Sequence, residues 1–185
     1  MKRITFFMVM FAALFMLSCG SLSMVESTKK PVLKASADKA LLVVSRTTSY
    51  GWGKVIDNFV DQKFIGQTQG KSYFVAQIDP GVHYIISSAE NRGCAKINFE
   101  AGKTYFLNNV IYPGAWSART KFMADKIEYF NEQLPEMSYF VVAPNAEIPE
   151  LSKEDYDESV ADYEKDIKED PQDFETITNI IGYSL

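Results

Sequence analysis

The chain has 185 residues, 46% of them hydrophobic and 23% charged, with one histidine, two cysteines and a formal net charge of −5. This length and apolar content suffice for one folded domain with an extension. Thirteen acidic and three basic residues lie between Pro144 and Leu185. The rest of the chain is therefore only weakly basic, which excludes the concentrated basic face of a nucleic-acid-binding protein.

The first residues have the parts of a bacterial lipoprotein signal peptide. Lys2 and Arg3 give a positive start, and residues 4–17 are an apolar run of 14 residues, shorter than the roughly 20 that span a bilayer. The run ends in "MLSCG", which resembles a lipobox, a signal in which the cysteine is lipidated and becomes the mature N-terminus. An ordinary cleaved signal with a chance cysteine is the alternative. We predict a signal peptide over 1–18 and lipidation of Cys19.

Residues 19–37, small and polar without a sustained period, predict a tether between the lipid and the folded part. With Cys19 lipidated, Cys94 is the one thiol left, so an internal disulfide is excluded. Acyl chains such as palmitate would hold the protein to a membrane of the bacterial cell envelope, on the periplasmic side or at the cell surface.

Residues 38–143 contain short β-branched and aromatic runs separated by turn signals. The turns are Pro80-Gly81, Asn91-Arg92-Gly93 and Ala101-Gly102, and one helix is predicted over 125–134. Strands at near-regular intervals indicate an antiparallel β-sandwich or barrel. We predict a mainly β fold, an antiparallel β-sandwich. Its strands are expected in "KALLVVSRT", "KVIDNFVDQKFIG", "KSYFVAQID", "VHYIISSAE", "CAKINFE", "KTYFLNNVIY", "ARTKFM" and "MSYFVVAP".

Residues 144–185 predict an acidic helical appendage. Ser152 begins a capping box, and a narrow apolar stripe follows it along one helix face. A second helix is expected from Pro171, with Phe174, Ile177 and Ile181 on its buried face and Gly182 at its end. The narrow stripe predicts that the first helix of the appendage adds only a few kcal/mol at best to stability.

Two reactive-looking features in the sheet region do not predict an enzyme. In "GQTQGKS", residues 66–72, the glycine spacing of a phosphate-binding loop is wrong, and a strand follows where the motif needs a helix. A hairpin with its turn at Asn91-Arg92 would put Cys94 opposite Ala89 and roughly 20 Å from His83. One histidine also excludes the usual zinc sets. We therefore predict no catalytic residue, metal site or cofactor.

Four aromatic residues are the candidate ligand-binding residues: Tyr50, Trp52, Tyr112 and Trp116. All four lie in or beside loops marked by glycine or proline, "TSYGWGK" and "IYPGAWS". Flat amphipathic rings at the ends of a sandwich stack on sugars or anchor a partner. They also pack over the open end of a core, which is the alternative.

Three pieces of the chain, "ALLVVSRT", "DQKFIGQTQGKSYFVAQIDPGVHYI" and "FEAGKTYFLNNVI", occur in an order that resembles a family of exported bacterial lipoproteins of unknown function, related to the PEGA-type sandwich domains. The pattern departs at Asp61-Gln62, where Asp-Gly is more usual. The resemblance implies a β-sandwich and no known catalytic residue. The tail, "VADYEKDIKEDPQDFETITNIIGY", also looks like a tetratricopeptide repeat junction, although such repeats need about three copies to bury a core.

Together these features predict a lipid-anchored envelope lipoprotein that is not an enzyme. Its first expected role is that of a structural or adaptor module that binds another protein. The alternative is a module that binds a glycan or another small ligand through the loop aromatics.

Overall fold

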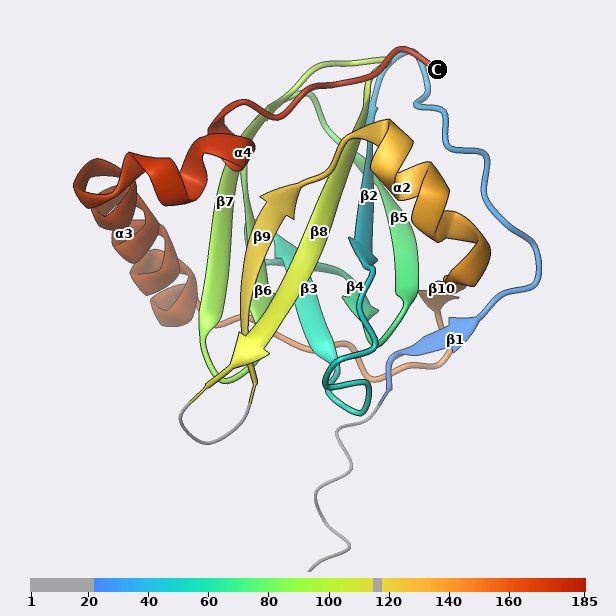
Figure 1. The fold of residues 1–185 in the computed structure, drawn as a ribbon, viewed down its shortest axis with the longest axis horizontal. Coiled ribbons are helices and arrows are strands. Elements are labelled where there is room, and N and C mark those ends of the chain that lie inside the picture. The colour runs from blue at the N-terminus through green and yellow to red at the C-terminus, as the bar shows by residue number, and fades with distance from the viewer. Residues whose placement is uncertain (1–21, 115–117) are drawn as a thin grey trace, which may run out of the picture.

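The computed structural model describes residues 22–114 and 118–185, which form two β-sheets packed face to face with helices outside them (Figure 1). The predicted signal peptide, Cys19 and Trp116 lie outside the described residues. The six-stranded sheet has the order β1-β10-β5-β2-β8-β9 and the four-stranded sheet the order β4-β3-β6-β7. The strands are β1 Met24–Glu26, β2 Ala40–Arg46, β3 Ile56–Val60, β4 Lys63–Thr68, β5 Ser72–Ile78, β6 Gly81–Ser88, β7 Arg92–Phe99, β8 Thr104–Pro113, β9 Ala118–Ala124 and β10 Ser138–Val142.

The prediction of a mainly β sandwich with a helical C-terminal segment is confirmed. Most neighbouring strands are antiparallel, as in the β3–β6–β7 series. The pairs β2–β8 and β10–β5 are parallel. Each parallel pair joins strands far apart in the chain. Strands β3 to β7 lie between β2 and β8 in the sequence, and β6 to β9 lie between β5 and β10.

The centre of the fold is β2, which is buried along its whole length. Because side chains alternate along a strand, Leu42 and Val44 face the other sheet, while Leu41 and Val43 face outward. The outward side is covered by α2, Ile127–Gln133, whose Phe130 is fully buried against Phe106, with 4.9 Å between ring centroids. The predicted helix over 125–134 is thus present.

The N-terminal segment differs from the predicted tether. Met24 is buried in the core between the sheets, and β1 pairs with β10 along its three residues. Ala35 packs in the outer cluster beneath α2. The sequence did not predict these contacts, because the segment is mostly polar and its few buried side chains follow no helical or strand periodicity.

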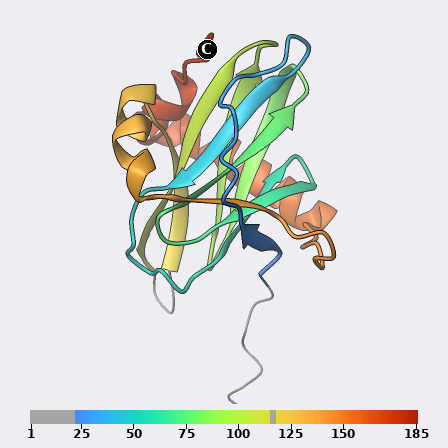
Figure 2. The same ribbon diagram turned by 90° about the vertical axis from the view of Figure 1, so that its right-hand side faces the viewer.

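The C-terminal segment packs on the outer face of the four-stranded sheet, opposite α2 (Figures 1 and 2). Its long helix is α3, Lys153–Glu169, and Ser152 caps it as predicted, with Oγ accepting from the Asp155 N–H at 3.0 Å. Arg92 of β7 pairs with Asp155 at 2.9 Å and with Glu158. Lys96 donates to Glu164 at 2.6 Å. A basic strand therefore binds the acidic helix.

The second C-terminal helix is shorter than predicted. A 3-10 turn, Pro171–Phe174, leads into α4, Glu175–Thr178, and the helix ends there rather than at Gly182. Ile177 is 2% exposed and reaches the core between the sheets, whereas Ile181, expected on the same buried face, is 61% exposed. Tyr183 then forms a backbone pair with Thr104 of β8, and this strand-like contact replaces the last helical turn.

Candidate functional site

Tyr50 and Trp52 lie on the loop between β2 and β3 with their rings exposed, 52% and 77% respectively. The backbone of this loop is held from inside the protein. Arg46 at the end of β2 is fully buried, and its guanidinium donates to the carbonyl oxygens of Lys54, Tyr50 and Gly51, each at 2.6 Å. The partners of this buried cation are thus backbone dipoles, and burial lowers the pKa of Arg46 to about 10.

Two glycines allow the loop between β2 and β3 to pack closely against the rest of the protein. Gly51 has φ +61, a conformation that side chains disfavour, and a Cβ there would lie 3.4 Å from the Arg46 guanidinium. Gly70, in the turn before β5, would place a Cβ 3.0 Å from the Trp52 Cβ. Trp52 is therefore an exposed ring on a fixed backbone.

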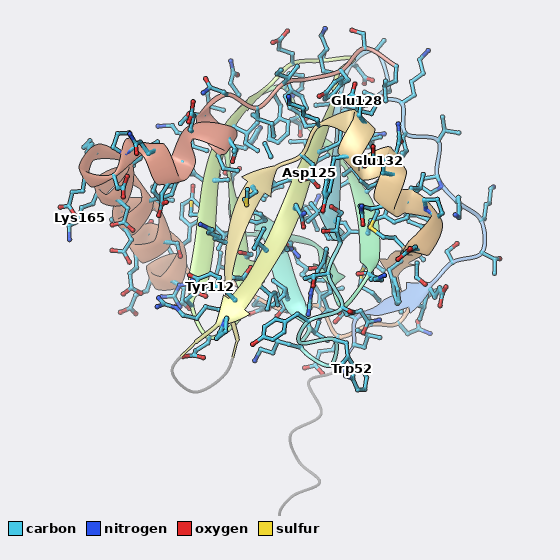
Figure 3. The ribbon with its side chains drawn as sticks, viewed as in Figure 1. Trp52, Tyr112, Asp125, Glu128, Glu132 and Lys165 are labelled. Atoms are coloured by element: carbon cyan, nitrogen blue, oxygen red, sulfur yellow. The ribbon has the colours of Figure 1, made fainter. Side chains whose placement is uncertain are left out.

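Tyr112 lies apart from this loop, at the end of β8 (Figure 3). Its ring lies 6.0 Å from the guanidinium carbon of Arg119 and lines a cleft that neither Tyr50 nor Trp52 lines. Within the described part of the chain, the predicted aromatic residues do not form one site.

The cleft has a volume of about 460 Å³ and lies where β7, β9, α3 and the following 3-10 turn meet. The wall from the strands is mostly basic, and the wall from the C-terminal segment is acidic. The strand side carries Arg92, Arg119 and Lys121 together with Glu90, and the acids opposite include Asp162, Asp166 and Asp173. Opposed charges across a cleft suit a polar or zwitterionic ligand better than an apolar one.

Two hydrogen bonds between the Asn91 side chain and the backbone of Thr120 hold β9 against the start of β7, where both line the cleft. Asn91 accepts from the Thr120 N–H at 2.7 Å and donates to the Thr120 carbonyl at 2.9 Å, in place of a neighbouring strand. Gly93 allows β7 to approach β9, because a Cβ there would lie 3.2 Å from the Lys121 Cα. The sequence shows Asn91 and Gly93 as turn residues, and only the fold gives them this second role.

His83 and Cys94 are not a catalytic pair in the structure. The predicted register is wrong, because Cys94 pairs with Ile86 and not with Ala89. His83 lies three residues beyond Ile86, about 10 Å along the strand and on the opposite face. His83 Nδ1 lies 2.8 Å from an Asp61 carboxylate oxygen. Burial raises the pKa of the Cys94 thiol to about 12, so the reactive thiolate is scarce at neutral pH.

A buried polar cluster between the sheets was not predicted from the sequence. Asn109 of β8 donates to Asn58 Oδ1 at 2.7 Å and to Thr68 Oγ1 at 2.9 Å, and all three residues are fully buried. The sequence feature that could have indicated this cluster is the presence of polar residues at inward-facing positions of otherwise apolar strands. Hydrogen bonds between the sheets offset the cost of burying these groups, so the cluster favours one alignment of the sheets.

In the phosphate-loop-like stretch, residues 66–68 belong to β4, residues 69–71 form a tight turn, and Ser72 begins β5. A strand therefore follows the stretch, as predicted. Ser72 Oγ donates to the Gln69 carbonyl at 2.8 Å and accepts from the Gln69 N–H at 2.9 Å. Lys71 has φ +48 and pairs with Glu136 near α2. Its ammonium group therefore has a structural partner.

In residues 22–114 and 118–185, no group of three or more His, Cys, Asp or Glu side chains is arranged to hold a metal ion. In the same ranges, no helix has the length and apolar character needed to cross a membrane. Comparison of the chain with protein-family models, curated proteins and solved structures gives no match. The resemblance to a PEGA-like lipoprotein family therefore stays a prediction.

Proposed function

We propose that this protein is a lipoprotein of the bacterial cell envelope, held to a membrane by acyl chains on Cys19. Its folded part is a non-enzymatic structural or adaptor module that binds another protein. The positive start, the apolar run and "MLSCG" support the anchor. The observation that carries the adaptor function is the acidic face of α3.

This face is rich in exposed carboxylates. Arg92 and Lys96 pair with Asp155, Glu158 and Glu164, but many other acids of the segment are exposed and lie outside these contacts. They include Glu154, Asp162, Asp166, Glu169, Asp170 and Asp173. Figure 3 shows Lys165 of the same helix pointing away from the sheets. A docked helix with such a face suits a partner with a basic surface.

Charge reversal on α3 tests the adaptor function. Asp162→Lys combined with Asp166→Lys should abolish capture of the partner that the wild-type protein retains from an envelope extract, and high salt should weaken the wild-type capture. Lysine at position 166, in the last turn of α3, is favoured by the helix dipole, and lysine has a high helix propensity at both positions, so α3 should persist. The matched control is Glu128→Lys with Glu132→Lys on α2, which are also exposed acids four residues apart. Equal capture by both variants would place the contact elsewhere.

Cys19→Ser tests the anchor. The variant should incorporate no radioactive palmitate and should leave the membrane fraction, because the thiol that carries the acyl chains is gone. Cys94→Ser is the control, since it removes the other cysteine and should be labelled like the wild-type protein. Equal labelling of wild type and Cys19→Ser would contradict the lipobox prediction.

A second candidate function is the binding of a glycan or small polar ligand in the cleft. It is favoured by Tyr112, whose ring and neighbouring Arg119 line a cleft with charges of both signs. Saturable binding of a soluble oligosaccharide that Tyr112→Ala abolishes would favour this function over the adaptor function.

A further inference from the structure

The described chain enters the fold at the end of the sandwich that carries Trp52. Leu22 leads into β1, which is fixed by its pairing with β10 and by the buried side chain of Met24. Figures 1 and 2 place β1 toward one end of the molecule and the C-terminus at the other, and Figure 3 labels Trp52 at the β1 end. Cys19 precedes Met24 by five residues, so its Cα lies at most about 18 Å from that of Met24.

The loop over 47–55, "TTSYGWGKV", has the composition of a segment that contacts a bilayer interface. It contains one basic residue, Lys54, and no acidic residue. Its exposed rings are those of Tyr50 and Trp52. Tyrosine and tryptophan are enriched at membrane interfaces because each joins an apolar ring to a polar group that stays hydrated.

The Arg46 hydrogen bonds fix the conformation of this loop before it contacts a membrane. They hold the carbonyl oxygens of Tyr50 and Gly51 in place, so little conformational entropy is lost when the loop meets a surface.

We infer that Tyr50 and Trp52 insert into the headgroup region of the membrane that carries the lipid anchor. The inference rests on the proposed anchor at Cys19 and deepens it, because it sets the orientation of the protein. The β1 end faces the bilayer, and the C-terminal end points away from it. A lipid surface is favoured over a soluble glycan because the short connection to Cys19 keeps this end near the bilayer.

The test uses full-length lipidated protein in vesicles of equal parts phosphatidylcholine and phosphatidylglycerol. Trp116→Phe leaves Trp52 as the sole tryptophan, since the chain has two. We expect a blue shift of Trp52 emission in the vesicles and a loss of intensity when the lipids are brominated near the headgroup. If Trp116→Phe does not fold, as judged by circular dichroism, Trp116→Tyr replaces it.

The matched control moves the tryptophan to the C-terminal end through Trp52→Phe, Trp116→Phe and Ile181→Trp. Ile181 is 61% exposed and lies two residues before Tyr183, which pairs with Thr104 at the start of β8. The emission of a tryptophan there should be insensitive to brominated lipids. Vesicle flotation separates the two ways of failing. Protein that does not float refutes the anchor and the inference with it. Protein that floats but shows equal quenching at both positions refutes the inference alone, as does a Trp52 emission that responds to a soluble oligosaccharide and not to vesicles.

Discussion

A protein that ends at Pro144 is expected to lose most of its stability. The missing segment supplies Ile177 to the core between the sheets, and α3 covers the face of the four-stranded sheet where Ile86 is fully buried. Tyr163 of α3 is itself buried. Exposing or removing each such side chain costs about 1.5 to 3 kcal/mol, and the sum approaches the roughly 5 to 15 kcal/mol that stabilises a typical domain. Urea unfolding followed by circular dichroism measures the loss.

Two isoleucines of the tail give a matched control for this truncation. Ile177→Ala should lower the free energy of unfolding by about 2 to 5 kcal/mol, as for other buried large-to-small changes. Ile181→Ala, at a position that is 61% exposed, should change it by no more than about 0.5 kcal/mol. A truncated protein that unfolds cooperatively within a few degrees of the full chain would show that the sandwich is independent of its C-terminal segment.

Arg46→Met is expected to destabilise the protein by about 3 kcal/mol, because it removes three charge-assisted hydrogen bonds to loop carbonyls. For a chain of this size the melting temperature should fall by roughly 6 to 12 °C. Trp52 should also become more mobile, since its loop loses the internal contacts that hold it. Thermal unfolding and the fluorescence anisotropy of Trp52, in the Trp116→Phe background, measure the two effects.

Two other arginine variants serve as controls for Arg46→Met. Arg46→Lys keeps a charge but lacks the planar guanidinium that reaches several carbonyls. Its melting temperature should therefore be intermediate between those of the wild type and Arg46→Met. Arg119→Met removes an exposed arginine and should change stability by about 0.5 kcal/mol or less. An unchanged melting temperature in Arg46→Met would mean that packing alone holds the loop.

The sequence by itself determined the local features of this protein. Most strand positions, the strand that follows Lys71, the helix around Phe130 and the cap at Ser152 depend on residues close together in the chain, through alternation, turn chemistry and capping. The lipobox at Cys19 is also a contiguous motif, and it stays a prediction because Cys19 lies outside the described residues.

The tertiary structure decided what depends on contacts between distant residues. Shifting a strand register leaves local propensities almost unchanged, so the pairing of Cys94 with Ile86 could not be obtained from the turn alone. Met24 lies in a segment predicted to be a tether, and only the assembled sheets show that it is a core residue. Ile177 and Ile181 were both expected on a buried helix face, and only the fold shows that Ile177 reaches the core while Ile181 is exposed. The same holds for Arg46, whose partners are backbone carbonyls that carry no sequence signal. Tyr112 and Trp52 are similar loop aromatics in the sequence. The fold placed Tyr112 in a charged cleft and Trp52 on the surface at the β1 end, because strand order sets which loops meet.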